Sequence, residues 1–223
     1  MTKKLLSGVL CLSLITCIVM SGCAQKTSSY NWEVSIVETF NSSQGGLSVL
    51  PWLITMEDAK EILHIDDLPS DAYQQTEDPY LLVVKNVKLK EFRIPVDMQL
   101  MFAEDPNITQ EEGLRLIECM FYVPEVDGYS LFGSDSPPFE TIPEETREAF
   151  LQTQKEDREA CIKALLQRDD IVGTKVEQML TNSLLNGPIL MGIRPELSSL
   201  KEEVQAYTLF SNFGIRFYIG IPF

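Results

Sequence analysis

Histidine, positive charge and catalytic signatures are scarce in this sequence. Its 223 residues include one histidine, His64, and 18 lysines and arginines against 33 aspartates and glutamates, which gives a formal net charge of −15. There is no Gly-x-Ser-x-Gly elbow, no Walker-type glycine loop, no His-Glu-x-x-His and no Cys-x-x-Cys. Because nucleic-acid binding requires basic patches, the charge argues against a nucleic-acid partner. The missing motifs leave no ready-made catalytic constellation.

Long apolar stretches are also few. Only Leu5–Met20 is nearly unbroken, and its roughly 16 residues fall short of the roughly 20 that a membrane-spanning helix needs. It follows two lysines, Lys3 and Lys4, and ends in small residues. A charged start, a short apolar core and small residues at the end are typical of an export signal. A transmembrane anchor is the alternative interpretation.

The end of this segment, Met20-Ser21-Gly22-Cys23, resembles the lipobox of bacterial lipoproteins. The resemblance implies cleavage after Gly22 and lipidation of Cys23, including a diacylglyceryl group with palmitate-like chains. Two acyl chains anchor a protein stably, whereas one binds only marginally. We therefore expect a protein held at the extracytoplasmic side of the cell membrane, with a signal over residues 1–22, a tether over 23–29 and a single domain over 30–223.

The expected mature chain is strongly acidic. Residues 1–22 contain two lysines and no acidic residue, so 33 acidic and 16 basic residues remain, a net of −17. This charge is repelled by an anionic membrane surface, so the lipid must hold the protein there alone. It suits a basic partner or divalent cations, or serves only solubility. Cys119 and Cys161 also remain. An exported location permits a disulfide between them, but we expect both to be free and buried.

Hydrophobic periodicity predicts an α+β domain, an antiparallel sheet with helices packed on one face. Three threonines, Thr55, Thr141 and Thr174, precede acidic residues at capping-box spacing and predict three helix starts. The long second helix should run to about Asp169, although its apolar face is thin. The predicted strands are residues 30–40, 80–89, 92–102, 114–123 and 207–221.

Some of these strands carry finer expectations. The segment 92–102 alternates most cleanly, and Pro95 within it indicates an edge strand or a bulge. The strand 114–123 is apolar on both faces and should be central. The final strand should bury the odd-numbered apolar residues from Leu209 to Ile221. Residues 66–79 are acidic and contain two prolines, which predicts a solvated loop.

Three groups of residues are candidates for chemistry. His64, beside Asp66 and Asp67, is either a base or metal ligand, or a helix-terminal histidine near acids. The segment from Asp105 to Glu112 resembles a calcium loop but lacks the required glycine and final glutamate. Four aromatic residues could line a sugar-binding surface or belong to the core: Tyr30, Trp32, Phe40 and Trp52. We predict no metal, cofactor or catalytic residue from these patterns.

The anchor and the missing catalytic residues together favour a non-catalytic lipoprotein. We expect it to act as an interaction or accessory module that contacts another envelope protein or the cell wall. One alternative is a lipoprotein that binds a small molecule for a transporter. The other is a carboxylate-based envelope hydrolase, which a deep pocket with two converging carboxylates of raised pKa would favour. An exposed apolar patch would favour the interaction module.

Overall fold

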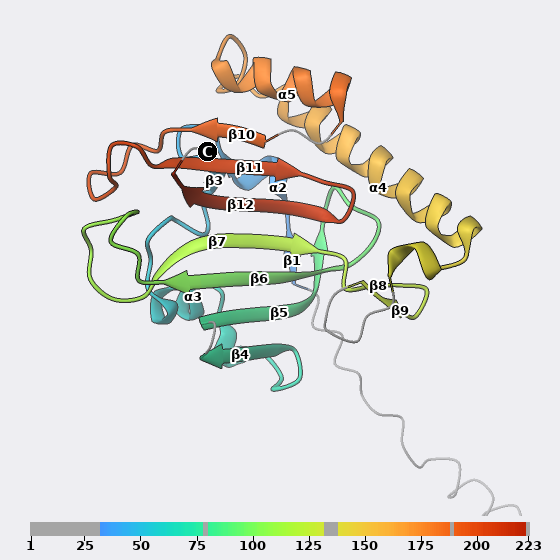
Figure 1. Ribbon diagram of the computed structural model, residues 1–223, viewed down its shortest axis with the longest axis horizontal. Helices are drawn as coiled ribbons and strands as arrows, with labels where there is room; N and C mark the ends of the chain where they lie inside the picture. The colour runs from blue at the N-terminus through green and yellow to red at the C-terminus, as the bar shows by residue number, and fades with distance from the viewer. Residues whose placement is uncertain (1–31, 78–79, 132–137, 188–189, 222–223) are drawn as a thin grey trace, which may run out of the picture.

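The computed structural model describes residues 32–77, 80–131, 138–187 and 190–221, and within them an eight-stranded sheet dominates (Figure 1). The strand order is β1-β5-β6-β7-β12-β11-β10, and β4 also pairs with β5. Its strands are β1 (Glu33–Val34), β4 (Tyr73–Glu77), β5 (Tyr80–Leu89), β6 (Val96–Ala103), β7 (Arg115–Tyr122), β10 (Leu190–Ile193), β11 (Gln205–Phe210) and β12 (Gly214–Gly220). Two small hairpins pair β2 (Phe40–Asn41) with β3 (Gly46–Leu47) and β8 (Glu125–Val126) with β9 (Tyr129–Ser130).

Four α-helices accompany the sheet: α2 (Ile36–Thr39), α3 (Met56–Ile62), α4 (Glu144–Leu165) and α5 (Lys175–Asn186). Short 3-10 turns lie at Ile65–Asp67 and Phe139–Thr141. Within the sheet, β1 pairs with β5 in parallel, and the other described pairs are antiparallel. The expectation of mixed helices and strands is confirmed, and the sheet, which was expected to be antiparallel, is curled and mostly antiparallel.

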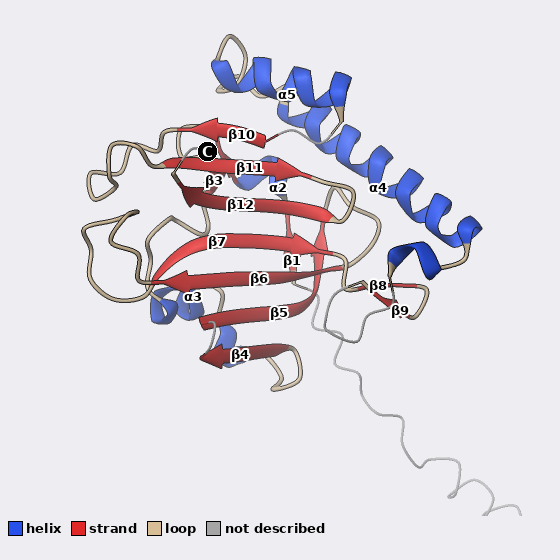
Figure 2. Ribbon diagram, in the orientation of Figure 1, coloured by secondary structure: helices blue, strands red, loops and turns tan. Residues whose placement is uncertain are grey.

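The two faces of the sheet differ in burial. One transverse row joins Leu82, Leu100, Cys119, Phe217 and Thr208 across five strands, and all five side chains are buried. Neighbouring residues on each strand point to the opposite face, and most of them remain partly exposed. Figure 2 shows α2 and α3 behind the sheet, and no described helix crosses the face turned toward the viewer. The core therefore lies on the helix side.

The pairing of β7 with β12 joins two parts of the sheet that are far apart in sequence. It places Phe217 opposite Cys119 and Ile215 opposite Phe121. The rings of Phe217 and Phe121 meet edge to face, with centroids 6.4 Å apart. Gly214 begins β12 with φ of +150°, and a Cβ there would lie 1.9 Å from the Phe121 carbonyl oxygen. Only glycine allows this approach.

Polar contacts compensate for the thin apolar face of α4. The Arg93 guanidinium donates to Asp157 Oδ1 (2.7 Å) and to Glu156 Oε2 (2.8 Å), and the Arg93 backbone N–H donates to Asp157 Oδ2 (2.8 Å). Further along the helix, Arg158 donates to Asn212 Oδ1 at 3.2 Å. The hydrogen bonds of Arg93 tie the loop before β6 to the middle of α4. This pairing satisfies the buried Asp157 carboxylate, which would otherwise be costly.

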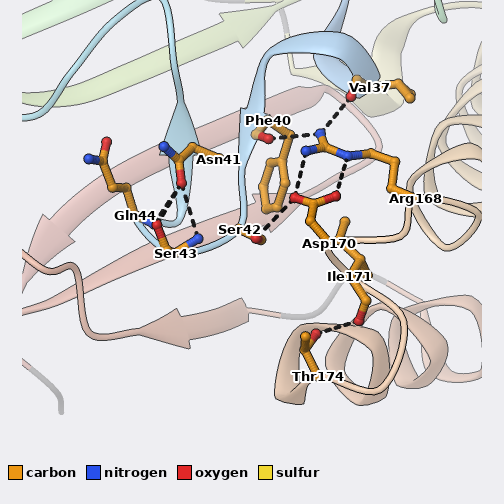
Figure 3. A network of polar contacts seen from close by, with 10 residues as sticks. All are labelled: Val37, Phe40, Asn41, Ser42, Ser43, Gln44, Arg168, Asp170, Ile171 and Thr174. Carbon is orange, nitrogen blue, oxygen red and sulfur yellow. Dashed lines mark hydrogen bonds and ion pairs between the residues drawn. The ribbon is translucent and has the colours of Figure 1, made fainter.

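The N-terminal segment is fixed at both ends of the one-turn helix α2. At its start, Glu91 accepts hydrogen bonds from the Ser35 hydroxyl (2.6 Å) and from the backbone N–H of Ile36 (3.0 Å). At its end, the Arg168 guanidinium donates to the Val37 and Phe40 carbonyls at 2.7 and 2.8 Å (Figure 3). An anion at the start of a helix and a cation at its end both match the helix dipole.

Asp170 orients this guanidinium. It accepts from Arg168 Nε at 2.8 Å and from Nη2 at 2.7 Å, and the Ser42 hydroxyl donates to it at 3.2 Å. The hydrogen bonds from Arg168 lower the pKa of the Asp170 carboxyl. The loop after α4 is thereby fastened to the first described segment of the domain.

Several sequence predictions in the first half are corrected. The strand predicted over 30–40 is instead β1, α2 and the start of β2, because Glu91 and Arg168 cap a helical turn there; residues 30 and 31 lie outside the described part. The loop predicted over 66–79 contains β4, which pairs with β5. Pro95 precedes β6, which is an interior strand and not an edge, and the pairing of β5 with β6 shifts register between Val84 and Val87, beside this proline. The predictions of β5, of central β7 and of the Thr55 capping box with Asp58 are confirmed.

In the second half, the capping box predicted at Thr141 is wrong. Pro143 precedes α4, and the Thr141 hydroxyl donates to the Pro138 carbonyl at 2.7 Å. The helix ends at Leu165, earlier than predicted. The single final strand over 207–221 is instead the hairpin β11–β12, and β10 was missed. The hairpin reverses the buried parity: Phe210 is buried in β11, whereas Leu209 is partly exposed.

We predict that removing residues 207–223 unfolds the whole domain, because β12 lies between β7 and β11 in the sheet. Phe217→Ala should cost about 3–5 kcal/mol in the free energy of unfolding, since the side chain is fully buried. The matched control Ile221→Ala, at a residue that is 47% exposed, should stay within about 1 kcal/mol. Thermal unfolding, monitored by circular dichroism, is measured for the truncated chain and for the Phe217→Ala and Ile221→Ala variants. Cooperative melting of the truncated chain near the full-length temperature would make this segment a peripheral arm.

We also predict that Gln154→Leu stabilises the protein. Gln154 on α4 is 1% exposed, and neither its amide oxygen nor its amide nitrogen has a hydrogen-bond partner among the described residues. An unsatisfied buried polar group costs about 1–3 kcal/mol, so its removal should raise the urea midpoint. The control Gln152→Leu removes an exposed amide that donates to Glu156 at 2.7 Å and should change little. A lower midpoint for Gln154→Leu contradicts the assignment.

Candidate functional site

The helix-free face of the sheet is the broadest candidate surface among the described residues. We call it the open face and define it by the side chains that the strand register places together on five strands. These are Leu81, Val83, Asp97, Gln99, Met101, Glu118, Met120, Tyr122, Tyr207, Leu209, Arg216 and Tyr218. Most of them are partly exposed, and most are apolar or aromatic. A sheet face that leaves many apolar side chains partly exposed is a candidate interaction surface.

A charged and aromatic ladder crosses the open face from β7 to β11. Arg216 Nη2 on β12 donates to Glu118 Oε2 on β7. The Arg216 guanidinium carbon also lies 4.8 Å from the centre of the Tyr218 ring, within the range of a cation–π contact. Tyr218 in turn stacks on Tyr207, with ring centroids 5.0 Å apart and planes 21° apart. These contacts hold the side chains of three strands in one fixed arrangement.

Tyr207 lies flat because its neighbour on β10 has no side chain. Gly192 is its cross-strand partner, and a Cβ at that position would lie 3.1 Å from Tyr207 Cε1 and 2.6 Å from Gln205 Oε1. A side chain at this position would require the Gln205 amide and the Tyr207 ring to shift. Burial raises the pKa of the Tyr207 phenol, with a smaller contribution from Tyr218. The phenol is therefore a neutral group at physiological pH.

Asp97 is the other charged residue of the open face. Partial burial raises the pKa of its carboxyl, and Glu125 adds to the increase, while the Asn86 backbone N–H and the charge of Lys85 oppose it. Asp97 Oδ1 accepts from Asn86 N at 3.0 Å. No ion pair to Asp97 occurs among the described residues. Its carboxylate is thus a partly desolvated charge without a bonded cation.

A shallower feature lies between the start of α4 and the β8–β9 hairpin. This hollow has a volume of about 450 Å³. Apolar groups and carboxylates both line it, including Ile94, Phe150, Glu125, Asp127 and Glu145. Asp97, the open-face carboxylate with a raised pKa, is not among its lining residues. The open-face carboxylate and this hollow are therefore separate features of the molecule.

His64 lies at the end of α3, in left-handed backbone with φ of +49°. Its side chain is 75% exposed, and Nδ1 is 3.9 Å from Asp67 Oδ2. Glu57, Glu61 and Asp66 surround it on an acidic surface. Among the described residues, no group of three or more histidines, cysteines and acids could hold a metal ion. This placement, at the end of α3 with Asp67 as an acidic neighbour, matches the helix-terminal interpretation of His64.

The segment from Asp105 to Glu112 is a loop fixed by its neighbours. Asp105 Oδ1 accepts from the Asn107 backbone N–H at 2.8 Å, and Thr109 forms an isolated bridge with Leu200. The Glu111 carboxylate points instead to Arg115, with a separation of 3.0 Å. These contacts hold the loop against the segment at Leu200 and against the start of β7.

The aromatic candidates for a sugar surface lie mainly in the core. Phe40 and Trp52 are buried, and the Trp52 indole N–H donates to the Gln44 carbonyl at 2.9 Å. The Phe40 ring lies 6.4 Å from that of Phe217. Trp32 packs against the same core, and Tyr30 lies outside the described residues. Cys119 and Cys161 are free and buried, and burial raises the pKa of both thiols.

Cys23, the signal over 1–22 and the tether over 23–29 lie outside the described residues. In the described part, no helix is both long and apolar enough to cross a membrane. Searches of protein families, curated proteins and solved structures returned no match to this chain. The open face was missed at the sequence level. Its signal was the set of residues that alternate with the buried ones in β6, namely Asp97, Gln99 and Met101.

Proposed function

We propose that this protein is a non-catalytic lipoprotein of the bacterial cell envelope, anchored through Cys23, that contacts another envelope component through its open face. The anchor rests on Met20-Ser21-Gly22-Cys23 and the apolar segment before it. The domain would stand on the extracytoplasmic side, joined to the lipid by the tether over 23–29. The mature chain, with 33 acidic and 16 basic residues and a net charge of −17, is repelled by anionic lipid, which favours a protein or the cell wall as the partner of the open face.

The observation that supports an interaction role is the character of the open face. The side chains of Glu118, Arg216, Tyr218 and Tyr207 hold one another in place through the ladder, so these four residues lose little conformational entropy when a partner covers them. Tyr, Met and Arg are also the residues enriched at protein interfaces. A rigid, partly apolar surface with few charges is the best binding feature of the described residues.

A small-molecule site remains the second candidate, on the basis of the hollow beside α4. Its volume of about 450 Å³ is within the range of ligand pockets. Its lining combines the apolar Ile94 and Phe150 with the acidic Glu125, Asp127 and Glu145. A ligand there would carry a positive charge. Binding of such a ligand, abolished by Glu145→Gln and unaffected by substitutions on the open face, would favour a transporter accessory over an interaction module.

The anchoring proposal predicts that Cys23→Ala leaves an unprocessed or released protein. The lipid cannot be attached without the thiol, and no described helix could hold the chain in the membrane. Membrane fractionation at high salt and alkaline pH, with mass analysis of the N-terminus, measures the outcome. A Cys23→Ala protein that has lost residues 1–22 and still sediments with membranes contradicts the lipoprotein assignment.

The interaction proposal predicts that Met101→Glu removes most crosslinked complexes of the protein in intact cells. Met101 lies on the open face beside Glu118, so a new carboxylate there is desolvated by any partner and repelled by its neighbour. The matched control is Leu185→Glu on α5, where the side chain is 75% exposed and away from the sheet face. Crosslinking followed by affinity capture and mass spectrometry compares the two. Equal complex yields from both variants would remove the open face from the proposal.

A further inference from the structure

The open face carries opposite charges at two separate positions. Arg216 stays 45% exposed even though it pairs with the buried Glu118, so its guanidinium keeps donors available on the surface. Asp97 has no ion-pair partner among the described residues, and its remaining polar neighbours are the Asn86 backbone N–H, Lys85, Glu125 and Tyr122. The face therefore offers a cation with spare donors and a carboxylate that lacks a bonded cation.

The strand register fixes how these two groups are spaced. Asp97 on β6 is opposite Tyr122 on β7, and Arg216 on β12 is opposite Met120 on β7. Asp97 and Arg216 are thus two strands apart and displaced by two residues along the strands. Strand spacing and rise put them about 12 Å apart. The midpoint between them lies on β7, between Met120 and Tyr122.

These positions make the face complementary to itself. Consider two copies that meet face to face, related by a two-fold axis that lies in the plane of contact. If this axis passes through the midpoint at right angles to the line from Asp97 to Arg216, the rotation exchanges the two positions. Each Arg216 then faces the Asp97 of the other copy, and the contact occurs twice. Interfaces of this isologous kind are the commonest in protein oligomers. A different partner would need a carboxylate opposite Arg216 and a cation opposite Asp97, whereas a second copy provides both by symmetry.

Charge on the rest of the molecule also favours this contact. With 33 acidic against 18 basic residues, most ways of bringing two copies together oppose like charges. On the open face, Arg216 balances one of two carboxylates, and the other residues are uncharged. The five strands of the open face cover an area of roughly 600 Å² when the sheet is viewed face on. This is close to the roughly 800 Å² per partner that stable interfaces bury, and confinement by a lipid anchor would raise the local concentration.

We propose that the open face binds the open face of a second copy of this chain, with Arg216 of each copy paired to Asp97 of the other. The inference rests on the proposed role of the open face as the contact surface. It names the partner as the protein itself. The membrane anchor brings the copies into one plane, and the dimer covers the apolar side chains that each copy would otherwise expose.

A crosslinking experiment in intact cells tests the dimer, using the full chain with a Met120→Cys substitution. Met120 lies beside the proposed axis, so two introduced thiols come close together and a bis-maleimide should join them. Cys119 points to the opposite, covered face and is buried, as is Cys161, so neither contributes background. The unsubstituted chain controls for the N-terminal cysteines. Leu185→Cys on α5 is the matched exposed control.

The expected result is a band of twice the monomer mass from Met120→Cys and none from Leu185→Cys. A Met120→Cys protein that reacts with a single-headed maleimide but yields no doubled band overturns the proposal. A crosslinked band that contains a different protein also overturns it, while it leaves the interaction role of the open face standing. If Met120→Cys gives no crosslink and Met101→Glu keeps its complexes, both the dimer and the interaction role of the open face are contradicted.

Charge exchange tests the proposed pairing itself. In the Met120→Cys background, Asp97→Arg should reduce the doubled band about tenfold, which corresponds to about 1.4 kcal/mol, because two arginines then face each other. Adding Arg216→Asp should restore it. Asp97→Arg leaves the Glu118–Arg216 pair untouched, so its result stands even where Arg216→Asp weakens folding. An undiminished band with Asp97→Arg contradicts the pairing.

Discussion

The pairing of β7 with β12 is the contact on which the rest of the structure depends. It connects β1, β4, β5 and β6 with the three C-terminal strands, and it places Phe217 against the rings of Phe40 and Phe121. Because it joins residues about a hundred positions apart, the chain must pay a large loop-closure entropy before the contact forms. Gly214 allows the close approach that completes it. Once the sheet is whole, one face can be buried continuously.

Polar contacts then determine how the helices cover that face. Arg93 binds the Asp157 carboxylate on α4, and Arg168 binds the carbonyls at the end of α2. Both arginines connect segments that are distant in sequence, and both satisfy backbone or carboxylate groups that would be costly to bury alone. The helices are therefore held on one side by directed bonds as well as by apolar packing. The other side of the sheet keeps its aromatic and aliphatic side chains partly exposed, ordered by the ladder from Glu118 to Tyr207.

Local patterns in the sequence predicted those elements whose stability is local. The alternation in β6, the apolar run of β7 and the Thr55 capping box all depend on residues within a few positions of each other. One failure came from distant residues, because Glu91 and Arg168 create α2 in a segment of strand-like composition. Another was local, because the Ser211–Gly214 turn divides a continuous apolar pattern into β11 and β12. For the open face, the sequence held only the alternation in β6, because the exposure of that face also depends on where every helix packs. Cys23 lies outside the described residues, so the lipid anchor stays a prediction.

The central claim is that the sheet has one face covered by helices and one face that contacts a partner in the envelope. Three methionines report on it directly: Met98 is fully buried on the covered face, whereas Met101 and Met120 lie on the open face. Hydroxyl-radical oxidation of these methionines, read by peptide mass spectrometry, should be fast at Met101 and Met120 and slow at Met98 in dilute purified protein. In intact cells, the account predicts that Met101 and Met120 become protected while Met179 on α5 does not change. Equal oxidation of Met98 and Met101, or no protection in cells, would contradict it.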